Sequence, residues 1–347
     1  MRALDRHGSP LTRRRLLQAG GSVAAVALAA PMIGRAGAQE TYEMRIATSE
    51  AIGSPLTEAF EKWTERLREE SGGRIDAQHF PASQLGSYTQ LIEGNRIGTI
   101  QATTGGPDTE EAVAPEIAAS GGAPGFIYRD EAHVDAVLQG ELGQKISDIA
   151  REKTGVEFVA YGEVGFRHLL AKRPVETLED LDGLKIRVPE LKVWVDFWSA
   201  LGANPTPLPY AEQYSALSTG VIDGLEADVF SILGFKWYEQ AKHLTLAYHW
   251  FLPKAVRVNA AFLDSLPEDL QTLVRESAKE TFAEQRATNR ANADAALEEL
   301  KTLGVEVHEP QDIEKWREAT EGQFAEFGQK GPEVQKMIDD IRALAQS

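Results

Sequence analysis

Two arginines are the residues whose chemistry best suits a binding site. Arg167 begins one expected strand, and Arg187 lies twenty residues later, within residues 183–189. A guanidinium group is planar and presents paired N–H donors that match both oxygens of a carboxylate. The two side chains could therefore bind an organic anion. The residues alone favour another interpretation of Arg187, a solvated edge charge, because Lys185 shares its face of the strand.

Sequence motifs of common enzymes are absent from the 347 residues. The chain has no P-loop, no dinucleotide-binding glycine motif, no nucleophile elbow and no H-E-x-x-H zinc motif. It has no cysteine, which excludes disulfides, thiolate metal sites and a cysteine nucleophile. No two of the later histidines are three or four residues apart: His79, His133, His168, His243, His249, His308. We therefore expect no catalysis, no cofactor and no metal ion.

The composition is that of a folded protein with a strongly acidic surface. Hydrophobic residues make up 42% of the chain and charged residues 26%, so wholesale disorder is not expected. The net charge is −17, which makes nucleic acid a poor partner. The first 38 residues carry +5, so the rest of the chain carries −22. An acidic protein that binds an organic anion needs a local positive site, which Arg167 and Arg187 could provide.

Residues 1–38 have the order of a secretory signal peptide: a basic stretch, a mildly apolar segment and a small-residue cleavage site. Residues 13–15 are arginines followed by two leucines, which resembles a twin-arginine signal. An ordinary secretory signal with extra arginines is the alternative. Cleavage is expected near Ala38, which predicts a periplasmic protein. No later apolar run reaches about 18 residues, so we expect no integral membrane span in the mature chain.

The first part of the mature chain alternates predicted strands and helices. Strands are expected over residues 43–48, 74–80 and 98–103. Helices are expected over residues 55–71, where apolar residues recur at spacings of three and four, and over 88–97. This alternation predicts an α/β protein with a mostly parallel sheet.

A second alternating set begins near Val156. Its expected strands are residues 156–161, 167–171, 184–188 and 221–226, and its expected helices are 191–201 and 210–218. Residues 204–209 contain three prolines and predict an extended connector.

Residues 268–303 contain neither glycine nor proline. Pro267 and Gly304 supply a start and a stop signal. One continuous helix here would be about 54 Å long at about 1.5 Å per residue, enough to brace two lobes. Two shorter helices separated by a break are the alternative.

Several segments together resemble the solute-binding proteins of tripartite ATP-independent periplasmic (TRAP) transporters, the dicarboxylate-receptor family. The resemblance covers residues 41–345 and rests on the order and spacing of the segments. They are residues 80–86 (FPASQLG), 165–167 (GFR), 183–189 (GLKIRVP), 201–210 (LGANPTPLPY), 214–226 (YSALSTGVIDGLE), 235–239 (FKWYE) and 266–271 (LPEDLQ).

This resemblance implies a two-lobed periplasmic-binding-protein fold with hinge strands and a long lobe-spanning helix. Lobe I would comprise residues 39–163 and 253–303 with the long helix, and lobe II residues 164–252. Residues 304–347 would form C-terminal helices that pack on the lobes. The implied function is an extracytoplasmic receptor that binds a small organic acid and delivers it to the TRAP membrane subunits.

The family also implies roles for individual residues. Its arginine matching Arg187 clamps the ligand carboxylate, and the one matching Arg167 adds a second contact, although Arg167 could instead brace a loop through a salt bridge. Glu226 either lines the site or orders Arg187 through an ion pair. The remaining candidates for ligand contact, each with core packing or another structural role as the alternative, are Tyr210, Ser49, Ser87, His249 and Trp194.

The chain departs from the family pattern after Glu226. Many relatives have an asparagine there that touches the ligand, whereas this chain has Ala227 and then Asp228. Asp228 could face a ligand hydroxyl or amine, or it could cap the following helix. The chain also lacks the tryptophan of a branch of the family that uses a metal ion. Hydroxylated acids such as sugar acids thus become candidates beside dicarboxylates.

Two other functions remain open at this stage. One is a periplasmic enzyme that acts on a carboxylated substrate. The other is the binding protein of an ATP-driven importer.

Overall fold

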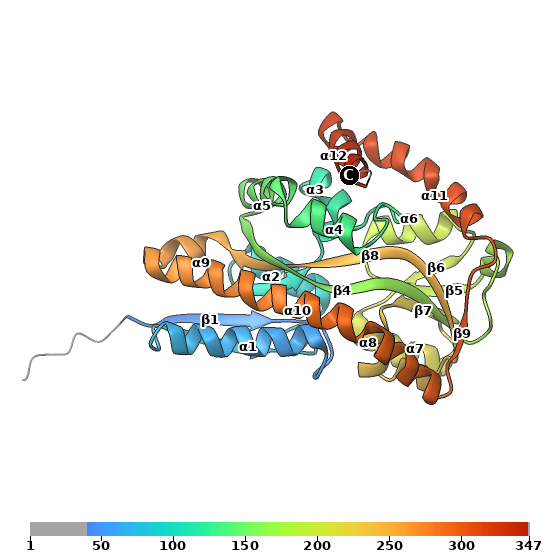
Figure 1. Cartoon of the computed structure of the whole chain (residues 1–347), viewed down its shortest axis with the longest axis horizontal. Helices are drawn as coiled ribbons and strands as arrows, with labels where there is room; N and C mark the ends of the chain where they lie inside the picture. The colour runs from blue at the N-terminus through green and yellow to red at the C-terminus, as the bar shows by residue number, and fades with distance from the viewer. Residues whose placement is uncertain (1–39, 346–347) are drawn as a thin grey trace, which may run out of the picture. The chain divides into compact units, whose positions relative to one another are not determined.

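The computed structural model describes residues 40–345, whose strands form a single nine-stranded sheet (Figure 1). The order across the sheet is β2-β1-β3-β8-β4-β7-β5-β6, and β9 also pairs with β8. The predicted leader and its cleavage site lie outside the described residues. The strands are β1 Tyr42–Ala47, β2 Ile75–Phe80, β3 Ala102–Gly105, β4 Val156–Ala171, β5 Lys185–Val188, β6 Asn204–Pro207, β7 Gly224–Ala227, β8 His243–Asn259 and β9 Glu306–His308.

The sheet is parallel toward both ends and antiparallel in the middle. β1 pairs parallel with β2 and β3 at one end, and β5 pairs parallel with β6 and β7 at the other. The central pairs β3–β8, β8–β4 and β4–β7 are antiparallel. The α/β class is confirmed, but the expectation of a mostly parallel sheet missed this antiparallel centre.

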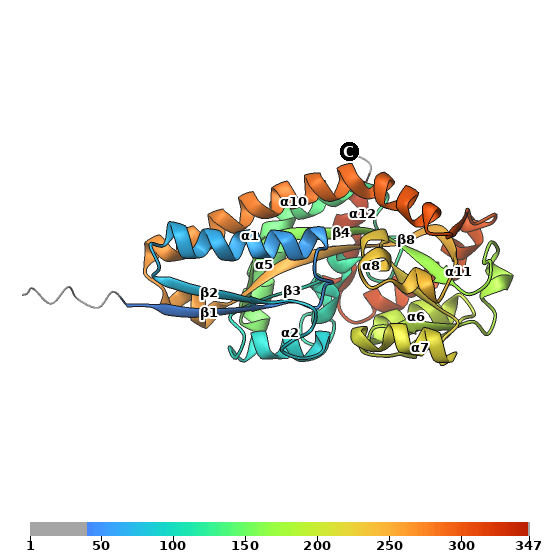
Figure 2. The same ribbon diagram turned by 90° about the horizontal axis from the view of Figure 1, so that it is seen from below.

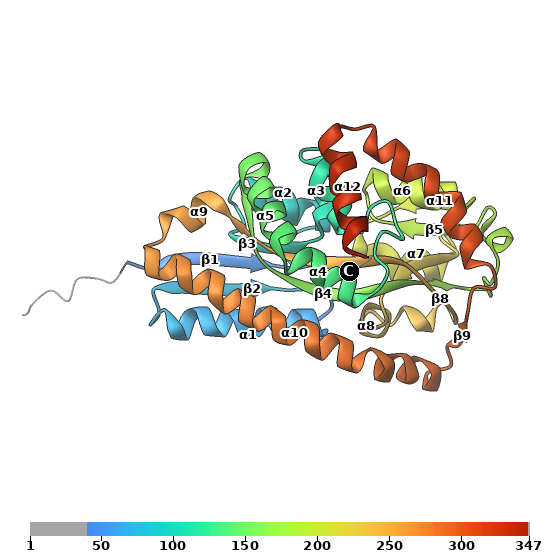
Figure 3. The same cartoon turned by 45° about the horizontal axis from the view of Figure 1, so that its top comes forward.

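Two long strands, β4 and β8, join the halves of the sheet (Figures 1 and 3). Their pairing begins with Val156 opposite Asn259 and ends with Ala171 opposite His243, and it contains three register shifts. The prediction of two separate strands over residues 156–161 and 167–171 was wrong, and β8 was not predicted. The chain passes through Gly165, at φ +90°, without leaving the sheet, because pairing with β8 continues beyond the bulges.

Helices cover the sheet on both faces, as the turned view in Figure 2 shows. Residues 204–207, predicted as an extended connector, pair with β5 as the edge strand β6, a position that tolerates proline. The helices are α1 Pro55–Glu70, α2 Tyr88–Arg96, α3 Pro115–Ala118, α4 Glu131–Leu138, α5 Glu141–Thr154, α6 Lys192–Ala200, α7 Gln213–Thr219, α8 Val229–Gly234, α9 Ala260–Ser265, α10 Glu268–Thr302, α11 Ile313–Gly328 and α12 Pro332–Leu344.

The long helix α10 is continuous over 35 residues, which excludes the alternative of two shorter helices. It is about 52 Å long at about 1.5 Å per residue. It packs on α1, which connects β1 to β2, and on α8, which follows β7. Trp63 of α1 donates its Nε1–H to the hydroxyl of Ser277 at 3.0 Å, and Phe60 packs edge-on against Phe282. The helix therefore braces both halves of the sheet.

The last two helices also contact both halves. α11 packs on α6, and α12 packs on α3 and α4. The lobe boundaries expected from the sequence stay a prediction. Within residues 40–345, no helix combines the length and apolar character that crossing a bilayer requires.

Candidate ligand-binding site

A cavity opens between the two halves of the sheet, beside β4 and β8. Its cavity volume is about 40 Å³. Several lining residues follow the carboxyl ends of β1, β3 and β7, which is where open α/β sheets bind ligands. The lining residues are Ser49, Glu50, Tyr88, Asp108, Val164, Arg167, Arg187, Pro189, Trp194, Tyr210, Asp228, Ser231, Leu252 and Lys254.

Arg187 on β5 is buried against the cavity, so it is not a solvated edge charge. Its Nε and Nη2 donate to the backbone carbonyl of Leu208 at 2.9 and 2.8 Å. Its Cζ lies 5.4 Å from the ring centroid of Tyr210, a cation–π contact. Burial lowers the pKa of Arg187 to about 10, which still leaves it charged at neutral pH. Among residues 40–345 it forms no ion pair with a carboxylate.

Arg167 on β4, by contrast, is held by carboxylates of the protein. It pairs with Glu226 on the neighbouring strand β7 through Nε, and its Nη2 donates to Glu226 Oε1 at 3.0 Å. Its Nη1 lies 3.6 Å from Asp228 Oδ2. Burial opposes the charge, but Glu226 and Asp228 raise the pKa of Arg167 above its ordinary value. Of the two roles considered for Glu226, the ion pair is present, but it is formed with Arg167 and not with Arg187.

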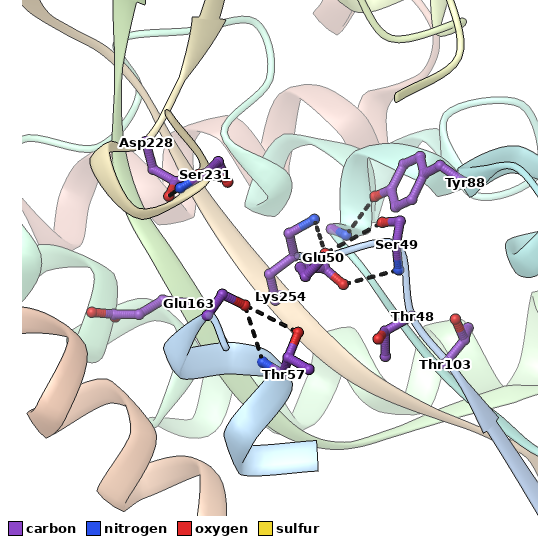
Figure 4. Close-up of polar contacts among 12 residues, drawn as sticks. Thr48, Ser49, Glu50, Thr57, Tyr88, Thr103, Glu163, Asp228, Ser231 and Lys254 are labelled. Atoms are coloured by element: carbon purple, nitrogen blue, oxygen red, sulfur yellow. Dashed lines mark hydrogen bonds and ion pairs between the residues drawn. The ribbon is translucent and has the colours of Figure 1, made fainter. Parts of the chain in front are cut away.

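Lys254 and Glu50 form a second buried ion pair at the cavity (Figure 4). Lys254 Nζ lies 2.9 Å from Glu50 Oε1 and 5.1 Å from the ring centroid of Tyr88. Glu50 also accepts the backbone N–H of Ser49 at 3.1 Å. Burial opposes the charge of Lys254, but Glu50 and Tyr88 raise its pKa. Sequence reasoning missed this pair, although a single lysine within the apolar run of β8 was an available signal.

Asp108 and Trp194 form a buried contact on another side of the cavity. The indole Nε1–H of Trp194 donates to Asp108 Oδ2 at 2.9 Å, and the indole stacks on Trp250 with 3.8 Å between centroids. Burial raises the pKa of Asp108 to about 6, against the opposing effects of the Trp194 hydrogen bond and of Lys254. The ring centroid of Trp194 also lies 5.6 Å from the guanidinium carbon of Arg167.

Asp228 caps α8, one of the two roles considered from the sequence, and it also lines the cavity. Its Oδ1 accepts the backbone N–H of Ser231 at 2.9 Å, and its Oδ2 accepts the Ser231 hydroxyl at 2.7 Å (Figure 4). Ala227 is buried and is not part of the lining. Tyr210 lines the cavity and packs edge-on against Phe235 and Trp237.

Three candidate residues lie outside the lining. Ser87 caps α2, where it forms a capping box with Gln90. Glu226 pairs with Arg167 and does not itself line the cavity. His249 is fully buried and stacks on Phe197 with 5.6 Å between centroids. Burial lowers the pKa of His249 well below 6.5, so the ring is neutral and its 4.0 Å separation from Glu226 Oε2 is not an ion pair.

The lining contains three cations, of which two have carboxylate partners in residues 40–345. Arg167 is paired with Glu226, and Lys254 with Glu50. Arg187 is the third, and its charge faces the cavity. The lining residues with polar side chains that the sequence analysis did not assign to the site are Glu50, Tyr88, Asp108, Ser231 and Lys254.

Two half-sheets joined by two long strands, with a polar cavity between them, define the class of two-lobed solute-binding proteins. Residues 46–330 match the bacterial extracellular solute-binding proteins of family 7. The chain belongs to this family, which confirms the resemblance found in the sequence.

Curated and solved relatives agree with this assignment. The 2,3-diketo-L-gulonate-binding periplasmic protein YiaO of Escherichia coli is 31% identical over 82% of this chain and 87% of its own. A TRAP periplasmic solute-binding protein of Xanthobacter autotrophicus, solved with β-D-galacturonate, is 31% identical with a TM-score of 0.82, over 86% of this chain and 99% of its own. One from Roseobacter denitrificans, solved with β-D-glucuronate, is 27% identical with a TM-score of 0.83, over 87% and 99%.

Proposed function

We propose that the cavity receives a small organic acid whose carboxylate binds Arg187. The observation that carries this proposal is the environment of the guanidinium, which is 3% exposed and pairs with no carboxylate among residues 40–345. A buried charge costs free energy unless a counter-charge is present. A ligand carboxylate would supply that counter-charge and would use the N–H donors that Leu208 leaves free.

Arg167 would assist from β4. Two of its nitrogens are engaged by Glu226, so the ligand would approach Nη1, which lies at 3.6 Å from Asp228. Tyr210 and Trp194 would then flank the bound acid, since each packs against one of the two guanidinium groups.

The rest of the lining suits hydroxyl groups better than a second carboxylate. Lys254, the remaining cation, is already neutralised by Glu50. Oxygen atoms that can accept or exchange hydrogen bonds with hydroxyls belong to Ser49, Glu50, Asp108, Asp228 and Ser231. We therefore infer a hydroxylated monocarboxylate, such as a uronic or aldonic acid. The uronates bound to solved relatives support this choice.

The receptor would deliver its ligand unchanged to TRAP membrane subunits from the periplasm. Membership of a solute-binding family supports transport over catalysis. Relatives described as periplasmic support this location, and the basic leader supports export with cleavage near Ala38. N-terminal sequencing of protein recovered from the periplasm tests the cleavage site.

Isothermal titration of the mature protein against uronates, aldonates and C4-dicarboxylates tests the ligand class. We expect a hydroxylated monocarboxylate to bind tightly and Arg187→Ala to lose about 2–5 kcal/mol of binding free energy. Lys185→Ala is the matched control, because Lys185 lies two residues away on β5 and outside the cavity lining. Equal binding by Arg187→Ala and wild type would refute the assignment.

Mass spectrometry of the same ligand after incubation with the protein separates transport from catalysis. We expect the acid to be recovered unchanged. A product that forms only in the presence of folded protein would favour an enzyme instead.

A further inference from the structure

Two histidines and two glutamates gather at the β8–β9 edge, and none of them lines the ligand cavity. His243 begins β8, and Glu306 and His308 belong to β9. β9 pairs parallel with β8, with His243 opposite Glu306 and Thr245 opposite His308. The pairing thus brings together side chains that lie more than sixty residues apart in the sequence.

The atoms that face one another in this cluster are potential metal ligands. His243 Nδ1 lies 3.1 Å from His308 Nε2 and 3.7 Å from Glu306 Oε2. One ligand atom from each of the three residues falls within 4.8 Å of the others. Two nitrogens bound tetrahedrally to zinc at about 2.0–2.1 Å are separated by roughly 3.3 Å, close to the separation found here.

Glu176 orients one of the histidines. His308 Nδ1 lies 2.9 Å from Glu176 Oε1, and Gln311 donates to the other oxygen of the same carboxylate. Because a carboxylate accepts, the neutral ring carries its proton on Nδ1 and directs the lone pair of Nε2 toward His243. A carboxylate that accepts the other ring N–H of a histidine is the usual outer partner of a metal-bound imidazole.

From this geometry we propose that His243, His308 and Glu306 bind a divalent transition-metal ion, with Zn²⁺ as the best match. Imidazole and carboxylate ligands suit Zn²⁺, and water would complete the coordination because the Glu306 side chain is 69% exposed. The ligands come from β8 and from the strand that follows α10. The bound ion therefore holds the start of the C-terminal segment against the sheet.

The direct test is titration of the mature, tag-free protein with Zn²⁺, and with Co²⁺ as a spectroscopic probe. We expect one equivalent to bind, visible-region Co²⁺ bands of a four-coordinate site, and a rise in the melting temperature. The double variant His243→Gln/His308→Gln should lose all three signals. Saturable one-to-one binding that the double variant retains would overturn the proposal.

A matched pair of glutamate variants separates coordination from general attraction to an acidic surface. Glu306→Gln removes a ligand, whereas Glu309→Gln removes the same charge at an exposed position one residue beyond β9 that is not part of the cluster. We expect clearly weaker binding for Glu306→Gln and unchanged binding for Glu309→Gln. Equal losses in both would also overturn the proposal.

The role of Glu176 has its own readout. Glu176→Gln should weaken Zn²⁺ binding about 10- to 100-fold, as outer-partner substitutions usually do. All titrations are made without organic acid, and Arg187→Ala should bind Zn²⁺ like wild type. The proposal of a metal site can therefore be refuted without affecting the proposal of an organic-acid site, and the reverse also holds.

Discussion

Arg167 and Glu226 form a buried ion pair across the antiparallel strands β4 and β7. Nη2 of the arginine donates to the side chain of Glu226 at 3.0 Å and to its backbone carbonyl at 2.8 Å. Arg187, on the next strand of the sheet, has only a backbone carbonyl and an aromatic face as partners among residues 40–345. The protein thus neutralises one of its two cavity arginines and gives the other no carboxylate partner among residues 40–345.

Breaking the Arg167–Glu226 pair should destabilise the protein strongly. We expect Glu226→Gln to lower the free energy of unfolding by about 3–5 kcal/mol, because it leaves a buried guanidinium without its main counter-charge. The double variant Arg167→Met/Glu226→Leu should recover most of this loss, since neither member of the pair is then a buried charge. Urea denaturation of the wild type and both variants measures the effect, and equal instability of the two variants would contradict it.

Alanine variants of Ser87 and Ser49 should distinguish an effect on helix capping from an effect on ligand binding. Ser87 caps α2 with a capping box, so Ser87→Ala should lower stability by about 1 kcal/mol and leave affinity for the organic acid unchanged. Ser49 lines the cavity, so Ser49→Ala should weaken binding. Thermal unfolding and calorimetry distinguish these outcomes. A loss of affinity in Ser87→Ala would show that Ser87 reaches the ligand.

Asp108 should make the stability of the ligand-free protein fall between about pH 4 and pH 6. Its pKa in the folded protein is about 6, against 3.8 in the unfolded chain, because burial disfavours the carboxylate. The folded state therefore holds the extra proton in this range, and its stabilising contribution is lost as the pH rises through 6. At about 1.36 kcal/mol per pKa unit, the loss amounts to about 3 kcal/mol.

Asp108→Asn supplies the reference for this measurement. The amide can still accept the indole N–H of Trp194, but it does not titrate. The free energy of unfolding of the wild type should fall relative to that of the variant from pH 4 to pH 6. Above pH 7 the difference between the two should stay constant. Parallel profiles over the whole range would disprove the assignment.

His249 should act in the opposite direction, at lower pH. Burial lowers its pKa well below 6.5, so the unfolded chain binds a proton that the folded protein does not. The stability this provides is present above pH 6.5 and is lost as the pH falls, at up to about 1.4 kcal/mol per pH unit. Chemical denaturation of wild type and His249→Gln from pH 7 to pH 5 checks this, and His249→Gln should be less acid-sensitive.

Much of the fold could be predicted because its signals are local. Pro267 and Gly304 bracket α10, and the spacing of apolar residues along α1 predicted the face that packs on α10. Ser54 caps α1 through the backbone N–H of Thr57, within one turn of chain. Signals of this kind lie within a few residues, so they can be read without knowing what the helix packs against.

The candidate site was only partly predictable for the same reason. The guanidinium chemistry of Arg167 and Arg187 and the family segments around them identified the two arginines. Lys254 and Glu50 were missed, because they are about two hundred residues apart and meet only when β3 pairs with both β1 and β8.

The sequence by itself determined the class of protein, the long helix and two of the three cations that line the cavity. Only the tertiary structure decided which carboxylate neutralises Arg167, that β4 continues through Gly165, and that His243 and His308 face each other. The physical reason is that strand pairing joins distant segments in a register that no local pattern encodes. The partner of a buried charge is set by that register, and so is the buried charge that has no carboxylate partner among residues 40–345.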